Sequence, residues 1–322
     1  GEATVTGTLT FTPANWNSAQ TVTVTGVNDN LVDGTQTSTL TVTVNDGNSD
    51  NDFDGVADQT VSVTTTDNDV AGFTIAQSGG STSVAESGTT DTFTVVLDAQ
   101  PASNVVLTIT SSDTGEATVT SSLTFTNANW NSAQTVTVTG VDDNIIDGTI
   151  TSNITIAVLD ETSDNAFDSL SDQTVSVTTT DNDVAGFTIA QSGGSTSVSE
   201  SGTTDTFTIV LNAQPTSDVV LSISSSDTGE ATVTSLLSFT TANWNSAQTV
   251  TVTGVDDNLV DGTKNSTITI TVVDVISDDS FDSVADQTVS AATTDNDVAG
   301  FTITQSGGST SVSESGSTDT FT

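Results

Sequence analysis

The feature that most constrains this chain is a seven-residue motif, Asp-Asn-Asp-Val-Ala-Gly-Phe, which recurs at a fixed period. Its three copies begin at Asp67, Asp181 and Asp295, and each start lies 114 residues after the last. A fixed period of this length indicates an array of like structural units rather than one large domain. The predicted division is a C-terminal part of a first repeat over 1–69, complete repeats over 70–183 and 184–297, and an N-terminal part of a further repeat over 298–322.

A second recurring motif places the first residue inside a repeat, and Thr322 falls in a segment that continues as Thr94 to Leu97 in an earlier copy. Gly-Glu-Ala-Thr-Val-Thr stands at Gly115 and Gly229, and also at Gly1. We therefore expect any anchor, export signal or adhesive tip to lie outside these residues.

Within each repeat, Thr, Ser and Asn alternate with Val, Ile, Leu and Phe. This period of two is typical of strands with one buried face, and no helical period is present. The pattern predicts an all-β fold of tandem immunoglobulin-like antiparallel β-sandwiches, with no linker, arranged as an extended rod. In the repeat 70–183 the expected strands are 73–76, 82–84, 91–97, 105–109, 117–120, 123–126, 135–141, 150–158 and 174–180.

The charge balance excludes several classes of partner. The chain has 42 acidic residues against one basic residue, Lys264, so its net charge is -41. Nucleic acid and anionic membranes would be repelled, and cations are the expected partners. Only 13% of residues are charged and a third are hydrophobic, so a folded chain is expected rather than a solvated polyanion.

The missing residue types narrow the chemistry. There is no Cys and no His, so disulfides, thiolate sites and the usual bases for a Ser or Thr nucleophile are all excluded. Paired carboxylates of the glycosidase type would remain, but they would recur in every repeat. We therefore expect a protein that is not an enzyme. No run of about 20 apolar residues predicts a membrane span.

The carboxylates gather in turns instead of being scattered over strand faces. In the repeat 70–183 one group lies in the loop 142–147, another in the repeated motif at 181–183, and Glu86 follows the second expected strand. Asp and Asn oxygens at close spacing suit Ca²⁺, which takes six to eight oxygen ligands. The alternative is a set of Asx turns, in which these side chains accept hydrogen bonds from their own backbone.

Taken together, these motifs make the repeat resemble the Calx-β family. The residues that carry the resemblance are Ser83 to Gly88, Phe93 to Leu97, Leu123 to Phe125, Val136 to Asp147 and Asp181 to Asp183. The resemblance covers the whole repeat. It implies a β-sandwich with calcium bound at one end, beside the connection to the next repeat.

The resemblance also implies a ligand set for each copy. In the first complete repeat the ligands would be Glu86, Asp142, Asp143, Asp147, Asp181 and Asp183, and in the second Glu200, Asp256, Asp257, Asp261, Asp295 and Asp297. The leading partial repeat has Asn28 at the first loop position and lacks the matching Glu, which leaves Asp29, Asp33, Asp67 and Asp69. Glu314 is the corresponding Glu of the last partial repeat.

Two departures from the family pattern imply fewer or weaker ions. Members of the family often have another acid three residues after the position of Asp147, where this chain has Gln36, Ile150 or Lys264. The closing triplet has Asn182 at its centre, where an acid is usual. A separate acidic loop at 160–168, which matches 46–54 and 274–282, varies between copies and is a weaker candidate for calcium.

Other motifs have simpler explanations. Trp16, Trp130 and Trp244 each stand in Asn-Trp-Asn, where a sugar platform is conceivable but a plug at the end of the sandwich is favoured. The sequons at Asn153 and Asn265 fall in strand patterns and are not favoured as glycosylation sites.

The near identity of the repeats favours a spacer, because length and stiffness need no site peculiar to one repeat. We expect stalk repeats of a long bacterial cell-surface adhesin, held rigid by calcium and serving attachment or gliding motility, with neighbouring repeats and calcium as partners. The alternatives are a module that binds carbohydrate or another surface, and a calcium sensor.

Overall fold

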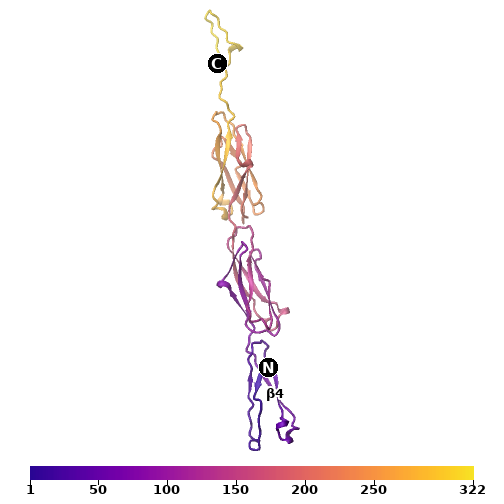
Figure 1. The fold of residues 1–322 in the computed structure, drawn as a ribbon. Helices are drawn as coiled ribbons and strands as arrows, with labels where there is room; N and C mark the ends of the chain where they lie inside the picture. Colours follow the sequence, from indigo (N-terminus) through magenta and orange to yellow (C-terminus); the bar gives the residue numbers. More distant parts are fainter. The chain divides into compact units, whose positions relative to one another are not determined.

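The computed structural model describes residues 1–322, which form β-strands joined by loops and short 3₁₀ turns. The chain divides into two compact units, each of which is described by itself. The first comprises Gly1–Asp143 with Gly148–Asn182, and the second comprises Asn144–Asp147 with Asp183–Thr322. Figure 1 shows the elements coloured along the sequence. The repeat boundaries given above stay a prediction.

The first unit contains a sandwich of two sheets. Its four-stranded sheet has the order β5 (Phe73–Gln77), β7 (Thr90–Leu97), β11 (Gln134–Gly140), β9 (Ala117–Val119). The five-stranded sheet has the order β10 (Ser122–Phe125), β8 (Val105–Ser111), β12 (Ile150–Val158), β13 (Gln173–Thr180), β6 (Thr82–Ala85). Short turns η3 (Ser78–Gly80) and η4 (Asp160–Thr162) lie between strands.

The same unit contains two smaller strand pairs from residues 1–69. β1 (Ala3–Val5) pairs with β2 (Val24–Gly26), and β3 (Gln36–Val42) pairs with β4 (Gln59–Thr65). The turns η1 (Asp46–Asn48) and η2 (Asn51–Phe53) join β3 to β4.

The second unit repeats the sandwich with the same strand order. Its four-stranded sheet runs β14 (Phe187–Gln191), β16 (Thr204–Leu211), β20 (Gln248–Gly254), β18 (Ala231–Val233). The five-stranded sheet, given in the same direction as its equivalent in the first unit, runs β19 (Leu236–Phe239), β17 (Val219–Ser225), β21 (Lys264–Val272), β22 (Gln287–Thr294), β15 (Thr196–Ser199). Its turns are η5 (Ser192–Gly194), η6 (Asp274–Ile276), η7 (Asp279–Phe281) and η8 (Ser306–Gly308).

The predicted all-β sandwich is therefore confirmed, with one exception to its antiparallel pairing. β6 lies parallel to β13, and β15 lies parallel to β22 with Val198 opposite Thr293 and Ser199 opposite Thr294. All other strand pairs are antiparallel. This parallel pair matters for the site, because β15 and β22 end side by side.

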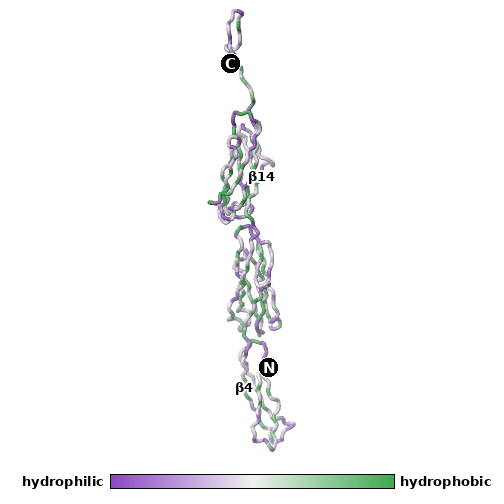
Figure 2. The backbone as a smooth tube through the Cα atoms, turned by 90° about the vertical axis from the view of Figure 1, so that its left-hand side faces the viewer, coloured by the Kyte–Doolittle hydropathy of each residue, from purple (hydrophilic) through white to green (hydrophobic).

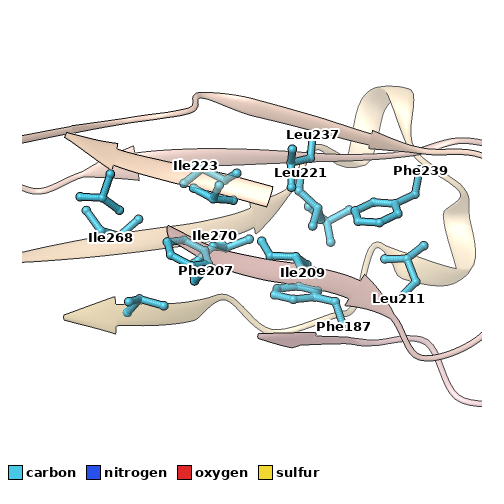
Figure 3. Packing of buried hydrophobic residues seen from close by; sticks show 14 of the residues in the cluster. Phe187, Phe207, Ile209, Leu211, Leu221, Ile223, Leu237, Phe239, Ile268 and Ile270 are labelled. Atoms are coloured by element: carbon cyan, nitrogen blue, oxygen red, sulfur yellow. The ribbon is translucent and has the colours of Figure 1, made fainter. Parts of the chain in front are cut away.

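The core follows directly from the alternation in the sequence. Figure 2 shows hydrophobic and hydrophilic residues interspersed along the strands of each unit. In β16, Phe207, Ile209 and Leu211 are buried and face the five-stranded sheet, where Leu221 and Ile270 are buried in turn (Figure 3). Each buried side chain of this size contributes about 1.5–3 kcal/mol. The alternate residues, mostly Thr and Ser, face outward.

Candidate metal centre

The predicted ligands of the second complete repeat all fall in the second unit, so their geometry is described from this copy. In the earlier copy Glu86, Asp142, Asp143 and Asp181 belong to the first unit, whereas Asp147 and Asp183 belong to the second.

The strand pairing brings these acids together. Glu200 directly follows β15, and Asp295 directly follows β22, its parallel neighbour. The Glu200 amide donates to the Thr294 carbonyl oxygen at 3.1 Å, which fixes the start of the turn. Gly254, at the end of β20, lies so close to the Ser199 carbonyl that any Cβ would clash with it. The glycine therefore lets β20 deliver the loop 256–261 to the same end of the sandwich.

Two groups of carboxylates form at this end. Glu200, Asp295 and Asp297 place carboxylate oxygens within 4.8 Å of one another, and so do Glu200, Glu230 and Asp261. Glu200 is common to both groups and is only 1% exposed. The geometry is thus that of two adjoining acidic groups that share one buried glutamate.

Glu230 is a member that the sequence analysis missed. It is 7% exposed and stands immediately before β18. Its backbone carbonyl accepts hydrogen bonds from the Val255 amide at 2.9 Å, just after β20, and from Thr293 Oγ1 at 3.3 Å, in β22 of the other sheet. The signal was present, since an acid precedes the same strand motif in all three copies, at Glu2, Glu116 and Glu230.

Part of the predicted set holds the loop in shape. Asp295 Oδ2 accepts hydrogen bonds from the amides of Asp261 at 2.9 Å and Gly262 at 2.7 Å, and its Oδ1 accepts from the Asp297 amide at 2.6 Å. Asp257 Oδ1 accepts from the Leu259 amide at 2.6 Å. The bonds from the Asp297 amide to Asp295 and from the Leu259 amide to Asp257, each spanning two residues, have the form of Asx turns.

Other carboxylate oxygens have no such donors. Glu230 Oε2 and Asp297 Oδ2 are buried and have no hydrogen-bond partner. A buried carboxylate oxygen without a partner costs free energy, so these atoms need a cation, a proton or water. The Asx turns therefore do not account for the whole cluster.

The pKa shifts follow from this arrangement. Burial raises the pKa of Glu230, and the carboxylates of Asp261 and Glu200 raise it further. Burial likewise raises the pKa of Asp297, with Asp295 the nearest charge responsible. For Glu200 the Asn296 amide lowers the pKa, but burial and the neighbouring carboxylates outweigh it, so that the net shift is upward.

Asp295 behaves oppositely to these three. The amides of Gly262 and Asp297 lower its pKa despite its burial. Asp295 is therefore a readily ionised carboxylate beside three carboxyl groups, Glu200, Glu230 and Asp297, whose pKa values are raised. A divalent cation at this position would stabilise the ionised form of these groups.

The residues present fit a hard cation. All the candidate ligand atoms in the two groups are carboxylate oxygens. The Asn296 side-chain amide nitrogen donates a hydrogen bond to Asp256 Oδ1 at 2.9 Å. Oxygen donors in a flexible loop cluster are the chemistry of Ca²⁺ sites.

Acidic residues also lie close together at two places in the first unit. Glu86 is 1% exposed, and burial together with Asp181, Asp143 and Glu116 raises its pKa to about 7 against the opposing amide of Asn182. The Asn182 side chain donates to Asp142 Oδ1 at 2.7 Å.

In residues 1–69, Asp67 Oδ2 accepts from the amides of Asp33 at 3.0 Å and Gly34 at 2.8 Å. The five acids that line one small pocket here are Glu2, Asp29, Asp33, Asp67 and Asp69. Glu314 is exposed and belongs to no such group.

The acidic loop 274–282 is built differently. Asp278 is 3% exposed, and its Oδ2 accepts from the Ser217 amide and from Thr216 Oγ1, each at 2.7 Å. Its Oδ1 accepts from the Ser280 amide at 3.0 Å and from Ser280 Oγ at 2.6 Å. Burial alone would raise the pKa of Asp278, but these donors lower it. In the first unit Asp164 accepts from the Ser103 and Ala166 amides in the same way.

The loop that carries Asp33 also touches the body of its unit. The Asn30 carbonyl accepts from the Gln100 amide at 2.7 Å, and the Val32 amide donates to the Gln100 carbonyl at 3.0 Å. Val32 packs against the hydrophobic core of the sandwich in the first unit. In the second unit Asn144 and Ile146 make the same two bonds to Gln214, at 2.6 Å and 3.1 Å, and Ile146 packs against the second core cluster.

The remaining motifs have structural roles or none. Trp130 and Trp244 are partly buried and pack against the two cores, as predicted for plugs, whereas Trp16 is exposed. Asn153 and Asn265 lie on exposed positions within β12 and β21. No helix in the structure is long and apolar enough to cross a membrane.

Comparisons with known proteins give likenesses of fold. No protein-family model matches the sequence, and the search of curated proteins found no match. Among solved structures, CBD12 from CALX1.2 is similar at 12% identity, with 62% of this chain and 78% of that chain covered and a TM-score of 0.24.

Domains of the surface-layer protein SbsC are also similar. Domains 5-6 match at 23% identity over 70% of this chain and 99% of theirs, with a TM-score of 0.24. Domains 4 and 5 match at 15% identity over the same shares, with a TM-score of 0.28. At these identities and TM-scores the likenesses assign no function to the chain.

Proposed function

We propose that this chain is a run of structural repeats from a long bacterial cell-surface or secreted protein, and that calcium holds each repeat and its connection rigid. The observation that carries the proposal is the group of Glu200, Glu230 and Asp261, whose oxygens lie within 4.8 Å of one another. Glu230 Oε2 lies buried there without a hydrogen-bond partner.

The donor set favours calcium over other metals. Zinc sites use Cys and His, and the chain has neither. Magnesium keeps several waters and binds through one or two carboxylates, whereas this cluster offers more. Two ions that share Glu200 would account for both acidic groups. The millimolar calcium outside cells would fill even weak sites.

The supporting argument for a structural role is repetition. The same acids recur with the same period, and Glu200, Glu230 and Asp295 each stand directly at the end of a strand. Because the loop with Asp33 also pairs with Gln100 and packs Val32 against the core, an ion that orders the acidic side of the loop would also order its apolar side. A spacer that holds an adhesive region away from the cell, in attachment or gliding, requires this stiffness.

Calorimetric titration of the calcium-free chain tests the proposal. We expect calcium binding at the two complete repeats, a higher melting temperature, and little response to magnesium. Small-angle scattering should give a maximum dimension that is constant in calcium and more variable in chelator. Absence of calcium binding at millimolar concentration would overturn the proposal.

A matched pair of variants locates the effect. Glu200→Gln removes the residue common to both groups and should abolish binding at that repeat alone. Asp274→Asn changes the net charge equally in an exposed turn and should bind like the unaltered chain. Binding that survives Glu200→Gln would place the ion elsewhere.

A further inference from the structure

The three copies of the acidic loop differ at one position. Three residues after the last loop Asp, the successive copies have Gln36, Ile150 and Lys264. Lys264 is the one basic residue in a chain with 42 acidic residues. A single cationic side chain at one candidate metal centre and not at the others distinguishes that repeat chemically.

Lys264 forms an ion pair with Asp261, a member of the acidic cluster. Its Nζ lies 3.3 Å from Asp261 Oδ2, and the two side chains are 45% and 23% exposed. Asp261 is in turn grouped with the buried Glu200 and Glu230. The ammonium therefore partly neutralises the Asp261 carboxylate, which is one of the three acids of that group.

The first copy makes no such ion pair. Gln36 Nε2 donates to the backbone carbonyl of Asp33 at 2.7 Å, so it holds the turn without bringing charge to the cluster. Ile150 has no polar group to offer. Only the copy with Lys264 has a cation of its own.

We propose that Lys264 is an affinity-setting residue: a built-in counter-ion that competes with calcium for Asp261, so that this repeat binds calcium more weakly than the repeat with Ile150. The inference rests on the calcium function proposed above. Binding in the repeat with Lys264 requires the ammonium to leave Asp261 or to remain as a like charge beside the ion, and either costs affinity. Without calcium, the same ammonium relieves repulsion among the acids. The repeats would then fill in order as calcium rises.

Nuclear magnetic resonance of the full ¹⁵N-labelled chain separates the sites during a calcium titration. The Gly262 amide donates to Asp295 Oδ2 at 2.7 Å, and the Gly148 amide donates to Asp181 Oδ2 at 2.9 Å, so each reports its own centre. In the unaltered chain we expect the Gly148 signal to saturate at lower calcium than the Gly262 signal.

Substitutions then test the lysine itself. Lys264→Ile should tighten the calcium affinity seen at Gly262 about fivefold, which corresponds to about 1 kcal/mol for a partly exposed charge pair. Lys264→Arg should leave it nearly unchanged. Ile150→Lys should weaken the affinity seen at Gly148. In calcium-free protein, Lys264→Ile should lower the melting temperature of this repeat by about 2 °C.

A charge-restored control separates a local effect from a global one. Lys264→Ile combined with Ser238→Lys, on the exposed face of β19, keeps the net charge and should behave like Lys264→Ile. Unchanged affinity in Lys264→Ile, or an effect cancelled by Ser238→Lys, would overturn the role of Lys264 and leave the calcium function intact. A failure of the unaltered chain to bind calcium would instead overturn the proposed function.

Discussion

The two acidic regions of the second unit have similar composition and opposite chemistry. At one end Glu200, Glu230 and Asp297 are crowded, and two of their oxygens are buried without a hydrogen-bond donor. In the loop 274–282 Asp278 is also buried, but five hydrogen-bond donors satisfy its carboxylate. The first region raises the pKa of its carboxyls, and the second lowers that of Asp278.

Hydrogen-bond donors, not the number of acids, distinguish the candidate metal centre from the structural turn around Asp278. Thr216, Ser217 and Ser280 do for Asp278 what only an ion, water or a proton could do for Glu230. A carboxylate that its own chain satisfies has little to gain from calcium. Each prediction below tests this contrast.

Removal of calcium is expected to have the largest effect. A ligand at a thousand times its dissociation constant stabilises the folded state by about 4 kcal/mol. Each complete repeat should therefore lose about that much stability on transfer to chelator, while the turn around Asp278 keeps its hydrogen bonds. Denaturant unfolding followed by the fluorescence of Trp130 and Trp244 measures the loss. Equal unfolding free energy in calcium and in chelator would show that the acids around Glu200 gain no more from calcium than Asp278 does.

Asp278→Ala should have the next largest effect, and one that does not depend on calcium. It leaves the donors of Thr216, Ser217 and Ser280 without their acceptor, at a cost of about 3 kcal/mol in unfolding free energy. The measurement is the same unfolding curve with and without calcium. A loss that calcium reverses would mean that Asp278 belongs to a metal centre. Asp274→Asn, in the exposed turn nearby, is the matched control.

The effect of Glu230→Gln on stability should have opposite signs in calcium-free and calcium-bound protein. Without calcium the neutral amide relieves repulsion from Glu200 and Asp261 and should stabilise the repeat by about 0.5 kcal/mol, the scale of a solvent-screened charge interaction. With calcium it should weaken binding at least about tenfold. Paired thermal melts and titrations give both numbers. A variant that is destabilised under both conditions would show that Glu230 serves packing alone.

The stability of the calcium-free protein should also depend on pH. The pKa of Glu86 is raised to about 7 from 4.5, so the folded state holds a proton that the unfolded state releases. Its contribution to stability is complete below about pH 4.5 and is lost as pH rises through about 7. The pKa of Asp278 is lowered instead, so its contribution is present above 3.8 and is lost as pH falls.

Calcium-free stability should therefore decline from pH 5 to pH 8, and Glu86→Gln should flatten that decline. Unfolding curves of protein freed of calcium on a chelating resin measure this without a chelator whose own affinity changes with pH. A decline that persists unchanged in Glu86→Gln would assign it to other groups.

The sequence predicted the strands well, because a period of two reports burial on one face directly. The expected strand at 150–158 coincides with β12, and that at 91–97 differs from β7 by one residue. Alternation does not reveal which strands are neighbours, so the parallel pair of β6 and β13 could not be predicted. That pair depends on contacts between residues far apart in the chain.

The candidate site was predictable in part. Asp295 and Asp297 stand in a repeated acidic motif, whereas Glu230 lies outside the acidic motifs, near Asp227 alone, and joins the cluster through the pairing of β18 with β20. From the sequence, calcium binding and Asx turns were alternatives for the whole acidic set. In the structure they differ from residue to residue: Asp295 accepts a turn hydrogen bond from the Asp297 amide, whereas Glu230 Oε2 in the same cluster has no hydrogen-bond donor. Whether a carboxylate oxygen is satisfied depends on which hydrogen-bond donors the fold places beside it, and the spacing of acids in the sequence does not reveal those donors.

The bonds from the acidic loop to Gln100 and Gln214 also bear on how such a gene can change. Asn30 bonds to Gln100 and Asn144 bonds to Gln214, and both steps along the chain span the same number of residues. Recombination that adds or deletes whole periods would leave every such pair matched, whereas an exchange out of phase would separate loop from glutamine. An array built on these contacts can therefore lengthen or shorten between generations without any new contact having to evolve.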